Sequence, residues 1–402
     1  MIPEIRKQYN LAFTESKYQQ MIADIEQNWM GSIDFRLAET PIFLDQQFKA
    51  QLLAAGDSIN AFITGPNFKA LTENAFKQVQ TPPNEQGLPA CIVMDFAICK
   101  DNTGKAIPKL IELQGFPSLF GFEYQHDLAF RKNFEIPNGY SPYLNNFDGE
   151  TYLSFLSKTI KGTNSKHTVL LELFPNKQKT KIDFYITQHL LNIPIVCLTE
   201  VFVRGNQLYY HRDGKDFQIE RVYNRIVWDE LGKQNQNIQE KGKLLLKPLD
   251  IEWVTHPNHY YRISKFLLPL LSSPYVPKAY FLSALSTMPN PLSNYVLKPL
   301  FSFAGQGVII DVQQADIDRI KDPENWILQE KVNYAPVIET PTGAAKTEIR
   351  LFYFLDTLTQ KYIATLNLSR ISKGKMIGVS YNANATWVGG SIAYFETLNK
   401  LK

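Results

Sequence analysis

The spacing of hydrophobic residues predicts helices at the start of the chain and then a pair of strands. Over roughly the first 80 residues, apolar side chains recur at helical spacing, which predicts helices over Ser16–Met30 and Phe43–Ala55. Two apolar runs follow, Ala90–Cys99 and Pro108–Gln114, with a charged turn at 100–105 between them. Apolar runs that are separated by a short turn containing glycine predict a pair of strands.

The middle of the chain alternates between strand and helix patterns. We predict a buried strand over His167–Leu173, a helix over Thr180–Leu191 and a strand over Pro194–Val203. Further strands are predicted at Gln207–His211 and Glu220–Trp228. The order strand, helix, strand is typical of an open α/β sheet.

From about residue 256 the pattern changes again. Tyr260–Leu271 predicts a helix, and we expect another helix to close the chain after Gly389 and Gly390. The intervening runs predict strands over Tyr295–Pro299, Gly307–Val312, Trp326–Val332, Glu348–Leu355 and Tyr362–Arg370. The predicted class is therefore α/β (α+β), with units at residues 1–160, 161–255 and 256–402.

Composition fits a globular chain with more than one domain. The chain has 402 residues, of which 44% are hydrophobic and 20% charged, and this length exceeds what one core usually holds. Its 42 basic and 39 acidic residues give a net charge of +3, which does not argue for a nucleic-acid partner. The three cysteines, an odd and sparse set, favour a reducing compartment.

Targeting signals do not appear in the pattern. The charged N-terminus has no apolar run after it, and the apolar run 266–271 is too short to span a bilayer. We therefore expect a cytoplasmic protein with no membrane partner, and its oligomeric state is left open.

The most informative stretch surrounds Lys298. A predicted strand carries this lysine, and a turn that contains Ser302, Gly305, Gln306 and Gly307 follows it. Glycines let backbone N–H groups approach phosphate oxygens, and the lysine adds a positive charge. The spacing is not that of a P-loop, because no Gly-Lys-Ser/Thr follows. A hairpin turn with an exposed lysine is the alternative interpretation.

A second stretch carries candidate metal ligands. Asp95 and Glu112 fall on adjacent predicted strands, and Gln114 shares a strand face with Glu112 because the two are two residues apart. Two carboxylates and an amide oxygen suit Mg²⁺, which takes a few protein oxygens together with phosphates and water. The alternative is an exposed strand face with solvated carboxylates.

The order of these features resembles the nucleotide-binding half of ATP-grasp enzymes. A lysine at a predicted helix start, Lys265, precedes the lysine strand and glycine turn, and a strand that becomes polar at Gln329 follows. The resemblance implies that Lys265 and Lys298 contact ATP phosphates and that the loop 302–307 folds over them. It also implies that the adenine and ribose meet Gln329, Glu330 and Val332. A surface lysine on an amphipathic helix is the alternative for Lys265.

The position of the carboxylates in the chain narrows the resemblance to one branch of the ATP-grasp enzymes. The carboxylates precede the lysines, as in the circularly permuted, glutathionylspermidine synthase-like branch, whose pattern is Arg-x-Asp followed by Glu-x-Asn. Asp95, Glu112 and Gln114 fall on the Asp, Glu and Asn positions, which implies that they hold Mg²⁺. Val93 stands in place of the arginine, so a charge that would contact substrate or phosphate is lost.

The remaining segments resemble other parts of the same enzymes. The segment 161–255 is similar to the small Rossmann-like (pre-ATP-grasp) domain that is inserted in the permuted fold. Arg370 matches an arginine that meets the γ-phosphate or the tetrahedral oxyanion, and Arg350 is a second candidate for that task. The alternative for both arginines is a salt bridge on an antiparallel sheet. Asn384 lies in a loop that would reach the substrate.

The resemblance implies an ATP- and Mg²⁺-dependent carboxylate–amine ligase. Such an enzyme phosphorylates the carboxylate of a small molecule or peptide and transfers the acyl group to an amine, with release of ADP. The alternative is a catalytically degenerate protein that serves as a nucleotide- or ligand-binding module or scaffold. Val93 and Gln114 favour that alternative, and the intact lysines and carboxylates favour the enzyme.

Overall fold

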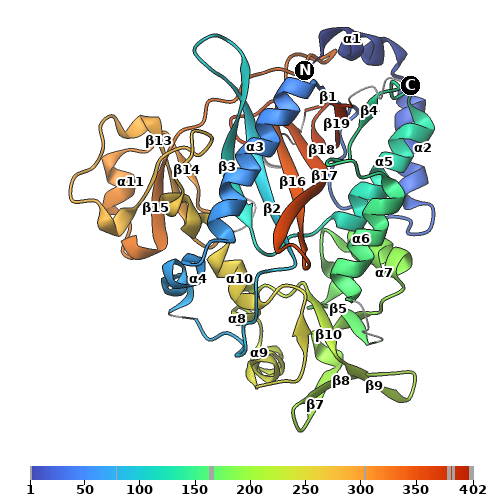
Figure 1. The fold of residues 1–402 in the computed structure, drawn as a ribbon, viewed down its shortest axis with the longest axis vertical. Helices are drawn as coiled ribbons and strands as arrows, with labels where there is room; N and C mark the ends of the chain where they lie inside the picture. Colours follow the sequence, from blue (N-terminus) through green and yellow to red (C-terminus); the bar gives the residue numbers. More distant parts are fainter. Residues whose placement is uncertain are drawn as a thin grey trace.

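A five-stranded antiparallel sheet forms the centre of the fold (Figure 1). The computed structural model describes residues 2–77, 79–162, 167–302, 305–377, 382 and 385–397. The strand order is β18-β17-β16-β2-β3. The strands are β2 (Cys91–Lys100), β3 (Ala106–Gln114), β16 (Lys346–Asp356), β17 (Lys361–Ser372) and β18 (Gly389–Ser391). The predicted pairing of Ala90–Cys99 with Pro108–Gln114 is confirmed, as are the strands predicted at Glu348–Leu355 and Tyr362–Arg370. The latter two strands pair with each other, and β16 also pairs with β2.

Helices cover both faces of this sheet (Figure 1). On one face lies α3 (Gln46–Ile63), whose buried apolar side chains join those of β2 and β16 in one core. On the other face, Phe120 of α5 (Phe120–Asn133) packs edge-on against Phe352 and Phe354 at 4.9 and 5.0 Å between ring centroids. Further helices are α1 (Pro3–Ala12), α2 (Glu15–Glu26), α4 (Phe68–Leu71), α6 (Gly149–Lys161) and α7 (Lys181–Leu191). None of the helices in the described ranges is long and apolar enough to cross a bilayer.

A four-stranded parallel sheet comes from the middle of the chain. Its order is β11-β10-β5-β6, and α7 connects β5 to β6, as the strand–helix–strand pattern predicts. The strands are β5 (Thr168–Glu172), β6 (Ile195–Cys197), β10 (Arg221–Asn224) and β11 (Glu252–Trp253). Between β6 and β10 the chain forms an antiparallel sheet that projects at the bottom of Figure 1. That sheet consists of β7 (Val201–Arg204), β8 (Gln207–Arg212) and β9 (Lys215–Ile219), and α8 (Trp228–Gly232) and α9 (Gln236–Lys243) follow β10.

A smaller antiparallel sheet lies at the left of Figure 1 and carries the lysine strand. Its order is β12-β15-β13-β14, with α11 (Gln314–Asp318) beside it. The strands are β12 (Ala279–Phe281), β13 (Tyr295–Pro299), β14 (Ile309–Ile310) and β15 (Trp326–Glu330). The strand predicted at Gly307–Val312 is reduced to two residues, because Gly307 and Asp311 adopt φ angles of 73° and 59° that interrupt extended backbone.

The predicted C-terminal helix is wrong, and the segment forms strands. Besides β18, β19 (Ala393–Glu396) pairs with β1 (Ile42–Leu44) and β4 (Tyr140–Ser141). Gly389 has a φ of 126°, and a Cβ there would lie 2.4 Å from the carbonyl oxygen of Arg36. The tertiary contact with this earlier segment therefore decides the conformation, which helical periodicity could not reveal.

The helix predicted over Tyr260–Leu271 is also divided. The α-helix α10 covers only Pro257–Arg262, and a 3₁₀ turn follows at Lys265–Leu270. Ser264 separates the two, because its side chain accepts a hydrogen bond from the Phe266 N–H and so caps the second turn. Lys265 therefore begins a new element.

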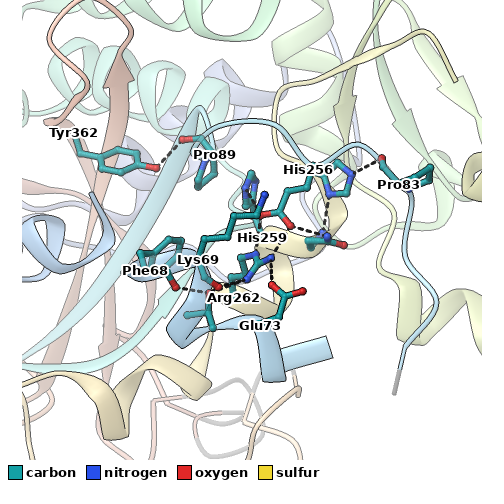
Figure 2. A network of polar contacts seen from close by, with 12 residues as sticks. Phe68, Lys69, Glu73, Pro83, Pro89, His256, His259, Arg262 and Tyr362 are labelled. Carbon is teal, nitrogen blue, oxygen red and sulfur yellow. Dashed lines mark hydrogen bonds and ion pairs between the residues drawn. The ribbon is translucent and has the colours of Figure 1, made fainter. Parts of the chain in front are cut away.

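Arg262 joins α10 to the segment before β2 (Figure 2). Its guanidinium is 1% exposed and donates to Glu85 in a fork at 2.7 and 2.9 Å. It also reaches Glu73 at 2.9 Å and the Lys69 carbonyl at 2.9 Å. His256 contacts the Pro83 carbonyl at 3.2 Å. A buried arginine thus fixes a loop-rich segment that has little regular structure of its own.

Replacing Arg262 with methionine tests this clamp. We expect Arg262→Met to lower the free energy of unfolding by about 3–5 kcal/mol, because it leaves the carboxylate of Glu85 buried without its arginine partner, with the amide of Asn258 still donating to it. Urea denaturation followed by circular dichroism measures the change. The matched control is Arg319→Met, whose arginine is 79% exposed in a 3.8 Å pair, and it should cost at most about 1 kcal/mol. Equal losses in the two variants would contradict a stabilising role for the clamp.

Candidate active site

Charged side chains form a strip across one face of the central sheet. Asp95 on β2 is the direct partner of Glu112 on β3 and of Arg350 on β16. Glu348, two residues before Arg350, is the direct partner of Arg370 on β17. Directly opposed residues, and residues two apart on one strand, point to the same face. Four strands therefore bring the predicted carboxylates and arginines together.

Asp95 lies at the centre of this strip. Its carboxylate accepts a fork from Arg350 at 2.6 and 2.7 Å and a third bond from Arg370 at 2.7 Å. The side chain is only 1% exposed. Burial alone would raise the pKa of Asp95, but the charges of Arg350 and Arg370 outweigh burial and hold that pKa below its ordinary value. Asp95 is therefore ionised, and arginines engage both of its oxygens.

The sequence interpretation missed Glu348. Its carboxylate pairs with Arg370 at 2.7 Å and accepts a hydrogen bond from the hydroxyl of Tyr334. Burial raises the pKa of Glu348, although Arg370 opposes the shift. Burial would lower the pKa of Arg370, but Glu348 and Asp95 raise it, so the guanidinium stays charged. The sequence did hold one indication of the role of Glu348: it is two residues before Arg350, so both side chains lie on the same face of the strand.

Glu112 and Gln114 form the β3 end of the strip, and Glu112 is the most exposed of its three carboxylates. Glu112 is 26% exposed, and its contact with Arg350 is a longer one of 3.8 Å. The Gln114 amide donates to Glu112 at 2.8 Å, so the amide oxygen is the end turned away from that bond. No cluster of three or more His, Cys, Asp or Glu side chains among the described residues could hold a metal ion. Mg²⁺ often takes only one or two protein carboxylates together with phosphates, so Glu112 and Gln114 fit that cation.

The two predicted lysines reach this strip from neighbouring elements. Lys298 on β13 donates to the Ile111 carbonyl at 3.2 Å and to the Gln329 side chain at 2.6 Å. Burial lowers its pKa to about 8. Lys265 is 6% exposed, donates to the Ser302 carbonyl at 2.9 Å, and has a pKa that burial also lowers. Lys298 therefore joins the small sheet to β3, and Lys265 joins its own turn to the glycine loop.

The glycine loop lies beside a hollow at the junction of the two sheets. Six of the residues that line the hollow are Glu112, Gln114, Phe116, Tyr260, Lys265 and Ser302. Gly305 and Gly307 both have φ angles of 73°, which only glycine adopts readily, and Gln306 lies between them. A Cβ at Gly307 would meet Pro299 at 3.0 Å. Phe303 and Ala304 fall outside the described residues, as does Asn384.

Unpartnered polar atoms mark the same junction. The Ser302 hydroxyl and the Gln329 amide nitrogen are buried and have no hydrogen-bond partner among the described residues. Glu330, at the end of β15, accepts from the Lys278 N–H at 3.2 Å, and Val332 lies two residues beyond it. A buried donor without a partner is costly, so the Ser302 and Gln329 groups are suited to meet a polar ligand.

A further pair of ionisable side chains lies at the carboxyl edge of the parallel sheet. Arg225 follows β10, donates to the Pro117 carbonyl at 2.6 Å and stacks 4.6 Å from the ring of Phe116. Glu172 ends the adjacent β5, and burial raises its pKa to about 8. The strand order reverses between β5 and β10, which is where open α/β sheets bind ligands. That topological rule was the signal by which sequence analysis could have found both residues.

Comparison with known proteins bears on the fold. No family model matches the chain, and no curated protein matches it. A solved structure does match: the apo form of a glutathione synthetase-like effector, GSS30, from Globodera pallida. The two are 10% identical with a TM-score of 0.57, and the match covers 94% of this chain and 96% of that chain. At this identity the likeness concerns the fold alone, so the chain has a mixed α/β fold related to that of the effector.

Proposed function

We propose that this chain is an ATP- and Mg²⁺-dependent carboxylate–amine ligase with a permuted, glutathionylspermidine synthase-like ATP-grasp fold. In this proposal residues 161–255 form the inserted pre-ATP-grasp domain. The observation that carries the proposal is the meeting of a buried lysine, Lys265, a half-buried lysine, Lys298, and a glycine turn with the charged strip. The fold shared with a glutathione synthetase-like protein agrees with it.

The charge of the site favours a polyanion. Four cationic side chains face three carboxylates, so the site has an excess of one positive charge, 4 − 3 = +1, even if every carboxylate is ionised. The cations are Lys265, Lys298, Arg350 and Arg370, and the carboxylates are Asp95, Glu112 and Glu348. Burial of these groups makes their field stronger than it would be in water. A triphosphate would relieve the mutual repulsion of the two lysines.

Each group has a part in the proposed reaction. Lys265 and Lys298 bind the phosphates, and the turn at Gly305–Gly307 closes over them and excludes water that would hydrolyse an activated acid. Glu112 and Gln114 would hold Mg²⁺, which neutralises phosphate charge when it is bound. The buried Nε of Arg370 has no partner within the described part of the chain and would donate to the transferred phosphoryl group or the oxyanion.

The proposed chemistry has two steps. A carboxylate oxygen of the acid bonds to the γ-phosphorus of ATP while the bond to the β-phosphate oxygen breaks, which releases ADP. The amine nitrogen then attacks the acyl carbon, and phosphate and a proton leave. No protein nucleophile is needed, because positioning and charge stabilisation drive both steps. Arg225 and the hollow beside Phe116 are where the acid or the amine would lie.

A binding protein without catalysis is the second candidate. Val93 occupies the place of the family arginine, and both oxygens of Asp95 are engaged by arginines. Release of ADP on addition of acid and amine mixtures, measured with and without Mg²⁺, separates the two functions. Nucleotide binding that is never followed by ADP release would favour the binding module.

Lys298→Ala tests the nucleotide site. We expect isothermal titration with ATP and Mg²⁺ to show about 10- to 150-fold weaker binding, since a charge-assisted hydrogen bond to phosphate contributes about 1.5–3 kcal/mol. Lys321→Ala is the matched control, because Lys321 is exposed in the same part of the chain. If the wild type does not bind ATP, the proposed function fails.

The pKa of Lys298 predicts a pH dependence of ATP affinity. Its pKa is about 8 in the free protein, so the charged form that binds phosphate is present below pH 8 and is lost above it. We expect ATP binding to weaken about 10-fold between pH 7 and pH 9, following the charged fraction. Lys298→Arg should remove this dependence, because arginine stays charged throughout. Identical pH profiles for the two proteins would assign the dependence to another group.

A further inference from the structure

Arginine donors occupy three of the roughly four lone-pair positions of the Asp95 carboxylate. Its two carboxylate oxygens accept three N–H bonds from two guanidinium groups at 2.6 to 2.7 Å. The side chain is 1% exposed, while Glu112 on the adjacent strand is 26% exposed. Charge-assisted bonds in a fork are the strongest hydrogen bonds that a carboxylate makes in a protein. Of the three carboxylates in the strip, Asp95 would therefore lose the most hydrogen-bond energy if it bound another ligand in place of the arginines.

Coordination of a divalent cation by Asp95 would carry a second cost. The ion would have to displace Arg350 or Arg370 and would then lie beside the displaced positive charge. Buried like charges repel strongly in a region of low dielectric constant. Glu112 and Gln114 can take a cation without breaking the Asp95 bonds, because only the 3.8 Å contact of Glu112 involves an arginine.

We infer that Asp95 is a positioning residue that fixes Arg350 and Arg370, and that it leaves the divalent cation to Glu112 and Gln114. The functional part of this inference rests on the proposed function, whereas the anchoring of the arginines does not. Arg370 is held by Asp95 and Glu348, and its Nε has no hydrogen-bond partner among the residues that the structure describes. The two carboxylates thus hold the guanidinium in one orientation while its side chain remains 33% exposed.

The position of Val93 agrees with this role. Val93 lies two residues before Asp95 on the same face and is completely buried, with Gln114 and Phe352 as its register partners. An arginine at that position would have to find a partner in an apolar environment. The positive charges beside Asp95 come from β16 and β17 instead. Valine at position 93 therefore fits an arrangement in which Arg350 and Arg370, and no residue of β2, supply the positive charges that pair with Asp95.

Nuclear magnetic resonance of ¹⁵N-arginine-labelled protein tests the inference. The Nε–H of Arg350, assigned by its loss in Arg350→Lys, should exchange with solvent at least about 100-fold more slowly than that of the exposed Arg319, because exchange requires local opening. Asp95→Asn should abolish this protection. Glu348→Gln is the matched control and should preserve it, since Glu348 pairs with Arg370 and not with Arg350.

Addition of Mg²⁺ and ADP to the wild type supplies the decisive result. If Asp95 is an anchor, the Arg350 signal persists while the amide of Gly305 in the glycine turn shifts. Loss of the Arg350 signal on binding would mean that Asp95 moves to the cation, and it would overturn the inference. Rapid exchange of Arg350 in the free wild type, or protection that survives Asp95→Asn, would overturn it as well.

The two proposals fail in different ways. If Mg²⁺ and ADP shift no signal at all, the proposed function is contradicted, and the comparison of Asp95→Asn with Glu348→Gln still decides whether Asp95 anchors the arginines. If Asp95→Asn does not fold, the exchange rate of Arg350 in the wild type remains the test. That measurement needs no carboxylate variant.

Discussion

The site depends on keeping one buried carboxylate ionised between two arginines. Asp95 lies in the middle of the central sheet, where an unpaired charge would be very unfavourable. Arg350 and Arg370 come from strands about 250 residues later in the chain and meet it only because β2 pairs with β16 and β17 lies beyond. The charged strip therefore exists only in this register of the sheet. If one strand shifted by one residue, its charged side chains would point towards the apolar core beneath α3.

A second constraint comes from the small sheet that carries Lys298. This lysine is bonded to a carbonyl of β3 and to Gln329 of β15, so it spans the boundary between two sheets. Burial lowers the pKa of Lys298 to about 8. Lys265 is held in the same way by the glycine loop. Lys298 therefore links the small sheet to β3, and Lys265 links its own turn to the start of the glycine loop.

The position of Lys265 depends on a network far from the charged strip. Lys265 begins its own turn because α10 stops at Arg262, and Arg262 is fixed by Glu85 and by the segment before β2. The Gly115 N–H bonds to the Ile263 carbonyl at 2.8 Å, so the same helix also positions the loop that follows Gln114. The Arg262 network of Figure 2 therefore helps to position both Lys265 and the segment that follows Gln114.

The sequence by itself determined the elements whose patterning is local. Alternating and continuous apolar runs gave the two strand pairs of the central sheet, and helical spacing gave the N-terminal helices, since these patterns reflect which face each element buries. The spacing of Glu112 and Gln114 also placed both on one strand face. The lysines, the glycine turn and the carboxylates were selected as candidate site residues because their order resembles that of ATP-grasp enzymes, and their roles remain predictions.

Only the tertiary structure decided which of these charged side chains are already paired with other side chains. Strand pairing turned Asp95 towards two arginines and revealed Glu348, and neither result follows from spacing along one strand. The chain end became β18 and β19 because Gly389 lies against the backbone of Arg36, whereas its local pattern favoured a helix. Arg225 and Glu172 became candidate ligand-binding residues only when the strand order placed them at the point where it reverses. Contacts between distant segments set these features, and a single sequence carries no direct record of such contacts.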